Sequence, residues 1–178
     1  MEWQAEDAFA RAKKIKCIIF DVDGVLTDGT IAVGERGESV KKFFCRDGLG
    51  ITLCRKCGLK TAIITGRTSP ITAYRVQELK IDALHQGCMD KREAYSALKQ
   101  EFSLPDEAFA YIGDDLIDLP VMLQVGLPTA VGDAAVEAKQ AAKLIASFPG
   151  GRGAAREIIE FILKAQGFWE KILADYRG

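Results

Sequence analysis

Short apolar runs alternate with longer stretches of mixed polarity along most of this chain. The runs at 15–20, 61–64 and 108–112 are apolar apart from Lys16 and Thr61, which is typical of strands buried on both faces of a parallel sheet. Shorter strands are expected near 83–84, 129–131 and 144–145. The mixed stretches between the strands predict helices near 2–14, 48–57, 70–79 and 90–102, one ending near 125, another before 144, and two at the C-terminus.

Glycines at 29, 34 and 37 separate short β-prone pieces within 29–44, which predicts a hairpin after the first strand. Strands that otherwise alternate with helices predict an α/β fold, a three-layer domain with a doubly wound parallel sheet. A chain of 178 residues suits one domain with a full core, so residues 1–178 are expected to form a single unit.

The composition limits the kinds of partner that this protein is expected to bind. The formal net charge is −1, so the chain lacks the basic excess that a nucleic-acid backbone requires. No apolar run approaches the roughly 20 residues of a membrane helix. The first residues lack the basic-then-apolar profile of a secretory signal, so a cytoplasmic location is expected, with neither membrane nor nucleic acid as a partner.

Five scattered cysteines argue against a disulfide framework. Cys54 and Cys57 form a C-x-x-C, a spacing found in redox and zinc sites, but no second Cys or His pair accompanies them. The segment 48–58 is expected to be a helix with Leu49, Leu53 and Cys57 on one face. A structural role is therefore favoured for both cysteines.

Polar residues stand where the predicted strands end. Asp21 and Asp23 follow the first strand, Thr65 ends the second, and Asp114 follows the third, while Lys91 opens an intervening helix. The carboxyl ends of parallel strands share one sheet edge, so these side chains are expected to converge there.

This set of side chains suits phosphoryl transfer. Crowded carboxylates need a cation, and oxygen ligands without His or Cys favour Mg²⁺, which readily accepts phosphate oxygens. One carboxylate can attack phosphorus, and a second, two residues on, can protonate the leaving oxygen and later activate water. Thr65 with backbone N–H groups can hold the transferring oxygens, and Lys91 can offset their charge.

The sequence here resembles the haloacid dehalogenase (HAD) superfamily. The segments Asp21–Val25, Thr65–Gly66, Lys91 and Gly113–Asp118 match its four motifs in order. The resemblance implies Asp21 as nucleophile, Asp23 as acid and base, and Mg²⁺ bound by Asp21, the backbone carbonyl of Asp23 and Asp114.

From about 15 to 163, the chain is similar to the 3-deoxy-D-manno-octulosonate 8-phosphate (KDO 8-phosphate) phosphatases. That family lacks a large cap domain and is described as tetrameric, with a neighbouring subunit closing each site. The resemblance therefore implies a homotetramer, a small phosphorylated sugar acid as substrate, a role in lipopolysaccharide synthesis, and substrate contacts from Gly66, Arg67, Arg46, Asp47 and Arg152. It rests on Asp21–Gly29, Lys42–Phe43, Arg46–Ile51, Ile64–Arg67, Gln86–Gly87, Gly113–Pro120 and Gly150–Glu157.

Arg67 bears on the choice of substrate. A sister group that acts on nine-carbon 2-keto-3-deoxy acid phosphates carries an acidic residue after Thr-Gly, and this chain carries arginine. A guanidinium can pair bidentately with a carboxylate or a phosphate. The eight-carbon substrate is favoured, and the nine-carbon one stays an alternative.

Two other functions stay open: a phospho-accepting signalling domain and a non-catalytic relative of the same fold. The paired Asp21 and Asp23 argue against both. Roles also remain open for several further positions. Asp28 is expected in a turn, and Asp118 is expected to orient its neighbours. Asp115 suits a helix cap or a metal ligand, and His85 is expected to be structural. The segment Gly150–Gly153 suits either an anion cradle or a flexible helix entry.

Overall fold

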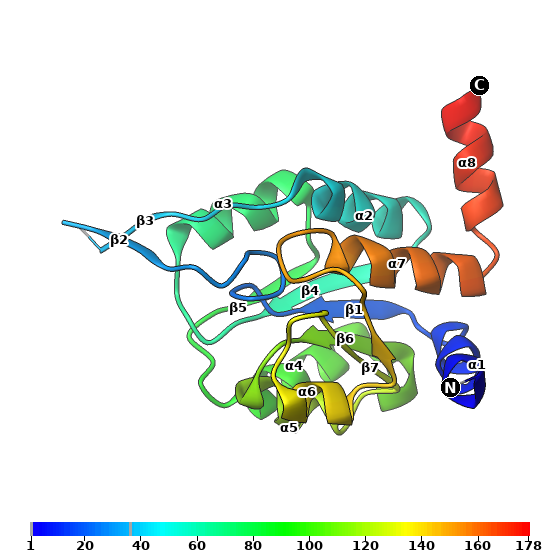
Figure 1. Cartoon of the computed structure of the whole chain (residues 1–178), viewed down its shortest axis with the longest axis horizontal. Coiled ribbons are helices and arrows are strands. Elements are labelled where there is room, and N and C mark those ends of the chain that lie inside the picture. The colour runs from blue at the N-terminus through cyan, green and yellow to red at the C-terminus, as the bar shows by residue number, and fades with distance from the viewer. Residues whose placement is uncertain (1, 36) are drawn as a thin grey trace.

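A six-stranded parallel sheet forms the centre of the computed structural model, which describes residues 2–35 and 37–178 (Figure 1). The strand order is β5-β4-β1-β6-β7-β8, so the chain winds outward from β1 first in one direction and then in the other. The predicted doubly wound α/β class is confirmed. The strands are β1 (Cys17–Phe20), β4 (Lys60–Ile64), β5 (Ala83–His85), β6 (Phe109–Gly113), β7 (Leu127–Ala130) and β8 (Leu144–Ile145).

Helices cover both faces of the sheet, which gives three layers. In Figure 1, α2, α3 and α7 lie above the sheet and α4, α5 and α6 lie below it. The helices are α1 (Glu2–Ala12), α2 (Cys45–Lys56), α3 (Pro70–Leu79), α4 (Lys91–Phe102), α5 (Leu119–Met122), α6 (Val136–Ala141), α7 (Ala154–Ala165) and α8 (Trp169–Arg177), with 3₁₀ turns η1 (Asp106–Ala108) and η2 (Leu116–Asp118).

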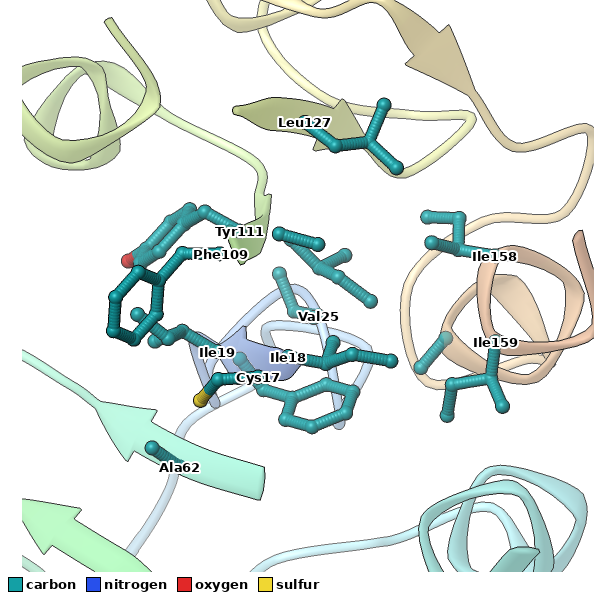
Figure 2. Close-up of a cluster of buried hydrophobic side chains, with 14 of the residues drawn as sticks. Cys17, Ile18, Ile19, Val25, Ala62, Phe109, Tyr111, Leu127, Ile158 and Ile159 are labelled. Atoms are coloured by element: carbon teal, nitrogen blue, oxygen red, sulfur yellow. The ribbon is translucent and has the colours of Figure 1, made fainter. Parts of the chain in front are cut away.

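The central strand β1 is buried along its whole length between β4 and β6. Its side chains alternate between the two faces, as strand geometry requires. Figure 2 shows Ile18 facing Ile158 and Ile159 of α7, whereas Phe109 and Tyr111 lie on the opposite side. The sequence of β1 has no polar residue, as a strand that is buried on both faces of the sheet requires.

Two helix boundaries follow directly from local chemistry. Pro70 occupies the first turn of α3, the Ser69 hydroxyl caps it by accepting from the N–H of Thr72, and Lys80 ends it in the left-handed region. The predicted range 70–79 is confirmed. At α4, the Asp90 carboxylate caps the helix and places Lys91 in its first turn.

The helix that was predicted to end near 125 is shorter in the structure. The segment forms the short turn η2 and then α5, which ends at Met122. The Asp118 carboxylate turns back to accept hydrogen bonds from the backbone N–H groups of Asp114 and Asp115. Asp115 and Asp118 together form a capping box, an interaction typical of helix starts, so the 3₁₀ turn η2 leads directly into α5.

The second helix starts earlier than predicted. The helix α2 begins at Cys45 rather than near 48, and of the predicted face Leu53 is buried, Cys57 is half-buried and Leu49 is 40% exposed. Gly50, Ile51 and Cys54 are also buried, and α7 packs closely there: a Cβ on Gly50 would lie 3.0 Å from Ile159 Cδ1. Cys54 and Cys57 are free thiols, and neither belongs to the one metal-ligating group found among the described residues.

A two-stranded hairpin, β2 (Ala32–Gly34) and β3 (Gly37–Val40), projects from the body of the molecule and is mostly exposed (Figure 1). It is the predicted insertion after the first strand, and no cap domain is evident. In the part of the chain that the structure describes, none of the helices has the length and apolarity to cross a membrane.

Candidate active site

Three carboxylates meet at the carboxyl edge of the central strands. Asp21 follows β1 and Asp114 follows β6, and these strands are paired in register up to Phe20 and Ile112. Asp118 approaches from η2. Each of the three aspartates has a carboxylate oxygen within 4.8 Å of the others. The convergence that the strand-end rule predicts for Asp21 and Asp114 is therefore present.

Lys91 is buried among these carboxylates. Its ammonium donates to Asp118 Oδ1 at 2.6 Å and to the Tyr111 hydroxyl at 3.0 Å, and it lies 3.1 Å from Asp21 Oδ1. Although burial opposes the charge, Asp21 and Asp118 raise the pKa of Lys91. The adjacent Arg92 is exposed and pairs with Asp90, so only Lys91 joins the site.

Asp118 organises the cluster through four contacts. One oxygen accepts from the Tyr111 hydroxyl at 2.6 Å and from Lys91, and the other accepts from the backbone N–H of Asp114 at 2.7 Å and of Asp115 at 3.2 Å. This supports the expectation that Asp118 orients its neighbours. Tyr111 was not predicted from sequence, although a tyrosine within a wholly buried strand must find a partner for its hydroxyl.

The cluster carries more negative charge than Lys91 neutralises. Burial, with the neighbouring carboxylate of Asp118, raises the pKa of Asp114 to about 8. Burial raises the pKa of Asp21 to about 6, even though Lys91 acts in the opposite direction. Asp21 Oδ1 is buried without an aligned hydrogen bond. Three carboxylates with one lysine and an unsatisfied oxygen fit a divalent cation that prefers oxygen ligands.

The loop after β1 comes very close to Asp114. Gly24 has φ +91°, and a Cβ at this position would lie 2.0 Å from Asp114 Oδ2. Position 24 therefore requires glycine for two reasons: its φ is positive, and there is no space for a Cβ. The result is that the Asp21–Gly24 turn and Asp114 face each other across the site.

Asp23 lies in a second group of charges, contributed by the hairpin and by the loop after β4. The Lys41 ammonium pairs with Asp23 Oδ1 and lies 3.1 Å from Glu38 Oε1. Arg67 lies 3.7 Å from Asp23 and 3.5 Å from Glu38. Sequence reasoning found Asp23 and Arg67 but missed Lys41 and Glu38, because only the folded hairpin brings them here.

Thr65 and Gly66 lie at the end of β4, beside β1. Thr65 is buried, its N–H donates to the carbonyl of His85, and its carbonyl accepts from the N–H of Cys88. A Cβ on Gly66 would lie 3.1 Å from Ile117 Cδ1, so this loop approaches η2 closely. The His85 contact uses only its backbone, in line with the structural role expected for this residue.

The remaining predicted substrate residues lie in another group. Asp47 is buried and accepts from the backbone N–H of Arg156 at 2.8 Å, so its carboxylate faces the start of α7. Burial raises its pKa. Arg46 and Arg152 line a pocket of about 430 Å³ with Arg156 and Phe44. Within one chain, this group is not part of the aspartate cluster.

Three open positions take local roles. Asp28 accepts from the backbone N–H of Thr30 in a turn, and its other oxygen lies 3.9 Å from Arg152. Asp115 caps η2 by accepting from the N–H of Leu116. In the Gly150–Gly153 segment, Gly150 and Gly151 pack against the backbone of the loop after β1, which leaves no space for a Cβ at either glycine.

Comparison with known proteins identifies the protein family to which the chain belongs. Residues 62–158 match the model of the haloacid dehalogenase-like hydrolase family. The chain therefore belongs to the haloacid dehalogenase-like hydrolases, as the four motifs imply.

More similar proteins narrow the class. The chain is 46% identical over 162 residues to the 3-deoxy-D-manno-octulosonate 8-phosphate phosphatase KdsC of Yersinia pestis, covering 91% of this chain and 87% of that protein. It is 44% identical over 161 residues to KdsC of Escherichia coli K12, covering 90% and 86%. Within the class, it belongs to the KdsC family of phosphatases.

A solved structure of a relative contains ligands. The structure of the KDO 8-phosphate phosphatase from Moraxella catarrhalis in complex with magnesium ion, phosphate ion and KDO superposes with a TM-score of 0.93. The two sequences are 36% identical, and the alignment covers 96% of this chain and 98% of that one.

Proposed function

We propose that this chain is a Mg²⁺-dependent phosphatase that hydrolyses 3-deoxy-D-manno-octulosonate 8-phosphate to KDO and phosphate, and that residues 1–178 form one HAD-like hydrolase domain. The observation that carries the proposal is the aspartate cluster, in which Asp21 lies beside Lys91 and the uncompensated charge fits a divalent cation. The substrate in this proposal is taken from the KdsC relatives, and the cofactor is taken from the relative whose structure contains magnesium.

The reaction proceeds in two steps. The Asp21 carboxylate attacks phosphorus, the bond from phosphorus to the sugar oxygen breaks, and Asp23 donates a proton to that oxygen. Asp23 then removes a proton from water as the water attacks the phosphorus of phospho-Asp21, which releases phosphate, frees the Asp21 carboxylate and leaves Asp23 protonated as at the start.

Other residues hold the reacting groups. Asp21, the backbone carbonyl of Asp23 and Asp114 would hold Mg²⁺, which offsets the charge of the phosphoryl oxygens when bound. Lys91 holds Asp21 in place, and Thr65 with the backbone of Gly66 binds the transferring oxygens. Arg67 is 45% exposed and only loosely paired, so its guanidinium is available to the substrate carboxylate.

Arg46, Asp47 and Arg152 do not lie in the aspartate cluster of their own chain. We propose that they contact substrate across a subunit interface, in a homotetramer in which a neighbouring subunit completes each site. Such an enzyme would be cytoplasmic and would supply KDO for lipopolysaccharide. Sedimentation analysis tests the assembly: a monomer with full activity would contradict shared sites.

Phosphate release from a panel of esters tests the activity. KDO 8-phosphate should be hydrolysed at least about a hundredfold more efficiently than generic alkyl phosphates, with the nine-carbon acid phosphate as the critical competitor. EDTA should abolish turnover and Mg²⁺ should restore it. Asp21→Asn should lower kcat by at least about a thousandfold, and retained activity in that variant would disprove the mechanism.

A further inference from the structure

We propose that Lys41 is a positioning residue that fixes the Asp23 carboxylate for proton transfer to the leaving oxygen. The proposal rests on the role given to Asp23 under the proposed function. Lys41 immediately follows β3 and lies outside the four motifs. It is therefore a part of the acid–base machinery that the hairpin, rather than the sheet, supplies.

The burial of Lys41 is unusual for its location. Most of the hairpin is exposed, with Val33 75% exposed, and the adjacent Lys42 is also exposed. The Lys41 side chain is only 3% exposed, because it points toward Asp23 and Glu38. Lysine is almost never buried unless it is paired, so this orientation depends on the two carboxylates.

The two oxygens of Asp23 have different environments. Oδ1 pairs with Lys41. Oδ2 is buried and makes no hydrogen bond within the described residues, and its nearest ion-pair partner, Arg67 Nε, is 3.7 Å away. Lys41 thus fixes the carboxylate through one oxygen and leaves the other free to give and take the proton.

Lys41 is itself held by a chain of contacts that leads to α3. Glu38 binds the Lys41 ammonium at 3.1 Å and also accepts a hydrogen bond from the Ser69 hydroxyl. Ser69 is buried, caps α3, and donates its N–H to Gln86 at 2.9 Å. The position of Lys41 is therefore set by a helix of the main body, although the residue belongs to the hairpin.

Leaving-group chemistry separates this role from a merely structural one. A sugar alkoxide is a poor leaving group and needs a proton, whereas nitrophenolate leaves readily without one. Lys41→Met should lower kcat/KM for KDO 8-phosphate by about 10- to 100-fold. The same variant should lower kcat/KM for p-nitrophenyl phosphate by less than about threefold, because kcat/KM reports the transfer to Asp21, in which nitrophenolate leaves without a proton from Asp23.

The experiment measures kcat and KM on a series of alkyl and aryl monophosphates for the wild type, Lys41→Met, Lys41→Arg and Asp23→Asn. Lys42→Met is the matched control and should resemble the wild type. Lys41→Arg should recover part of the alkyl phosphate activity. In an Asp23→Asn background, Lys41→Met should have little further effect, because both changes remove one function.

Equal losses of kcat/KM on alkyl and aryl substrates, with wild-type thermal stability, would overturn the proposal, as would an unchanged kcat/KM for alkyl phosphates. The outcome is separable from the proposed function. An alkyl–aryl difference without a preference for KDO 8-phosphate would refute the substrate and leave the role of Lys41 standing.

Discussion

Two lysines in this molecule each lie between two carboxylates, but the surroundings of the two sites differ. The inner cluster comprises Lys91, Asp21, Asp118 and Tyr111, and its side chains are almost fully buried. The outer cluster comprises Lys41, Asp23, Glu38 and Arg67, and it is formed by the projecting hairpin and two loops (Figure 1).

The difference separates two tasks of the site. The inner cluster is built on β1, β6 and the start of α4, so the packed core fixes the nucleophile. The outer cluster depends mainly on ion pairs, and the half-exposed Arg67 leaves it open to solvent and to substrate. A rigid reaction centre with a more adaptable substrate side follows from this arrangement.

The largest expected effect is on stability, from Lys91→Met. Removing the lysine leaves Asp21 and Asp118 buried without a counter-charge, so the free energy of unfolding should fall by about 3–5 kcal/mol. Lys41→Met should cost less, because Asp23 and Glu38 keep 18% and 13% of their side chains exposed and can be solvated when the lysine is removed. Urea denaturation in EDTA measures both.

Arg92→Met is the matched control for Lys91→Met, since Arg92 is the next residue of α4 and is exposed. Its effect should stay within about 0.5 kcal/mol. Similar losses for the Lys91 and Lys41 variants would show that the two clusters do not differ in the way proposed.

Two glycines provide an intermediate test. Gly24 and Gly37 have φ values of +91° and +97°, so alanine should cost each roughly 1–2 kcal/mol of backbone strain. Only at Gly24 would the new Cβ collide with Asp114, whereas at Gly37 it would have no described atom within 4 Å apart from those of its chain neighbours. Gly24→Ala should therefore also weaken Mg²⁺ binding by at least about tenfold, since a displaced ligand costs affinity.

Calorimetric titration with Mg²⁺ measures this difference, and unfolding curves measure the strain that the two variants share. Gly37→Ala should keep the affinity of the wild type. Equal Mg²⁺ affinities in the two variants would contradict the close approach of Gly24 to Asp114.

The last effect concerns the pH dependence of stability. The folded, metal-free protein retains a proton on Asp114 up to a pKa of about 8, far above the ordinary value of 3.8. The folded state then binds more protons than the unfolded chain, so this contribution to stability is full below about pH 4 and is lost as pH rises through about 8. Bound Mg²⁺ replaces the proton and should remove this dependence.

Thermal unfolding at pH 6 and pH 8 checks the prediction. In EDTA the midpoint should fall by a few degrees between the two pH values, and in Mg²⁺ the fall should be smaller. Asp114→Asn should flatten the dependence in EDTA. A wild-type protein with the same pH dependence in both buffers would contradict the raised pKa of Asp114.

Much of the fold was predictable because its signals are local. The strands β1 and β6 are continuous apolar runs, β4 is apolar from Ala62 onward, and α3 has proline in its first turn. One helix differs from its prediction in length. The segment after Asp115 was predicted as a helix to about 125, but it starts with the 3₁₀ turn η2, in which Asp118 accepts from the backbone of Asp114 and Asp115, and α5 ends at Met122.

The site divides in the same way. Asp21, Asp114 and Lys91 were predicted to converge from strand ends and a helix start, and the structure brings them together. Lys41 and Glu38 carry no such signal, since they lie on an exposed ribbon where charged residues are ordinary.

The sequence alone determined which strands are buried and which carboxylates end them, because apolar periodicity and strand-end position are properties of neighbouring residues. Only the tertiary structure decided that Lys91 is enclosed while Arg92 is solvated, that Tyr111 supports the cluster, and that Lys41 reaches Asp23. These outcomes depend on which groups can share a buried charge, and that is settled only when segments far apart in the chain meet.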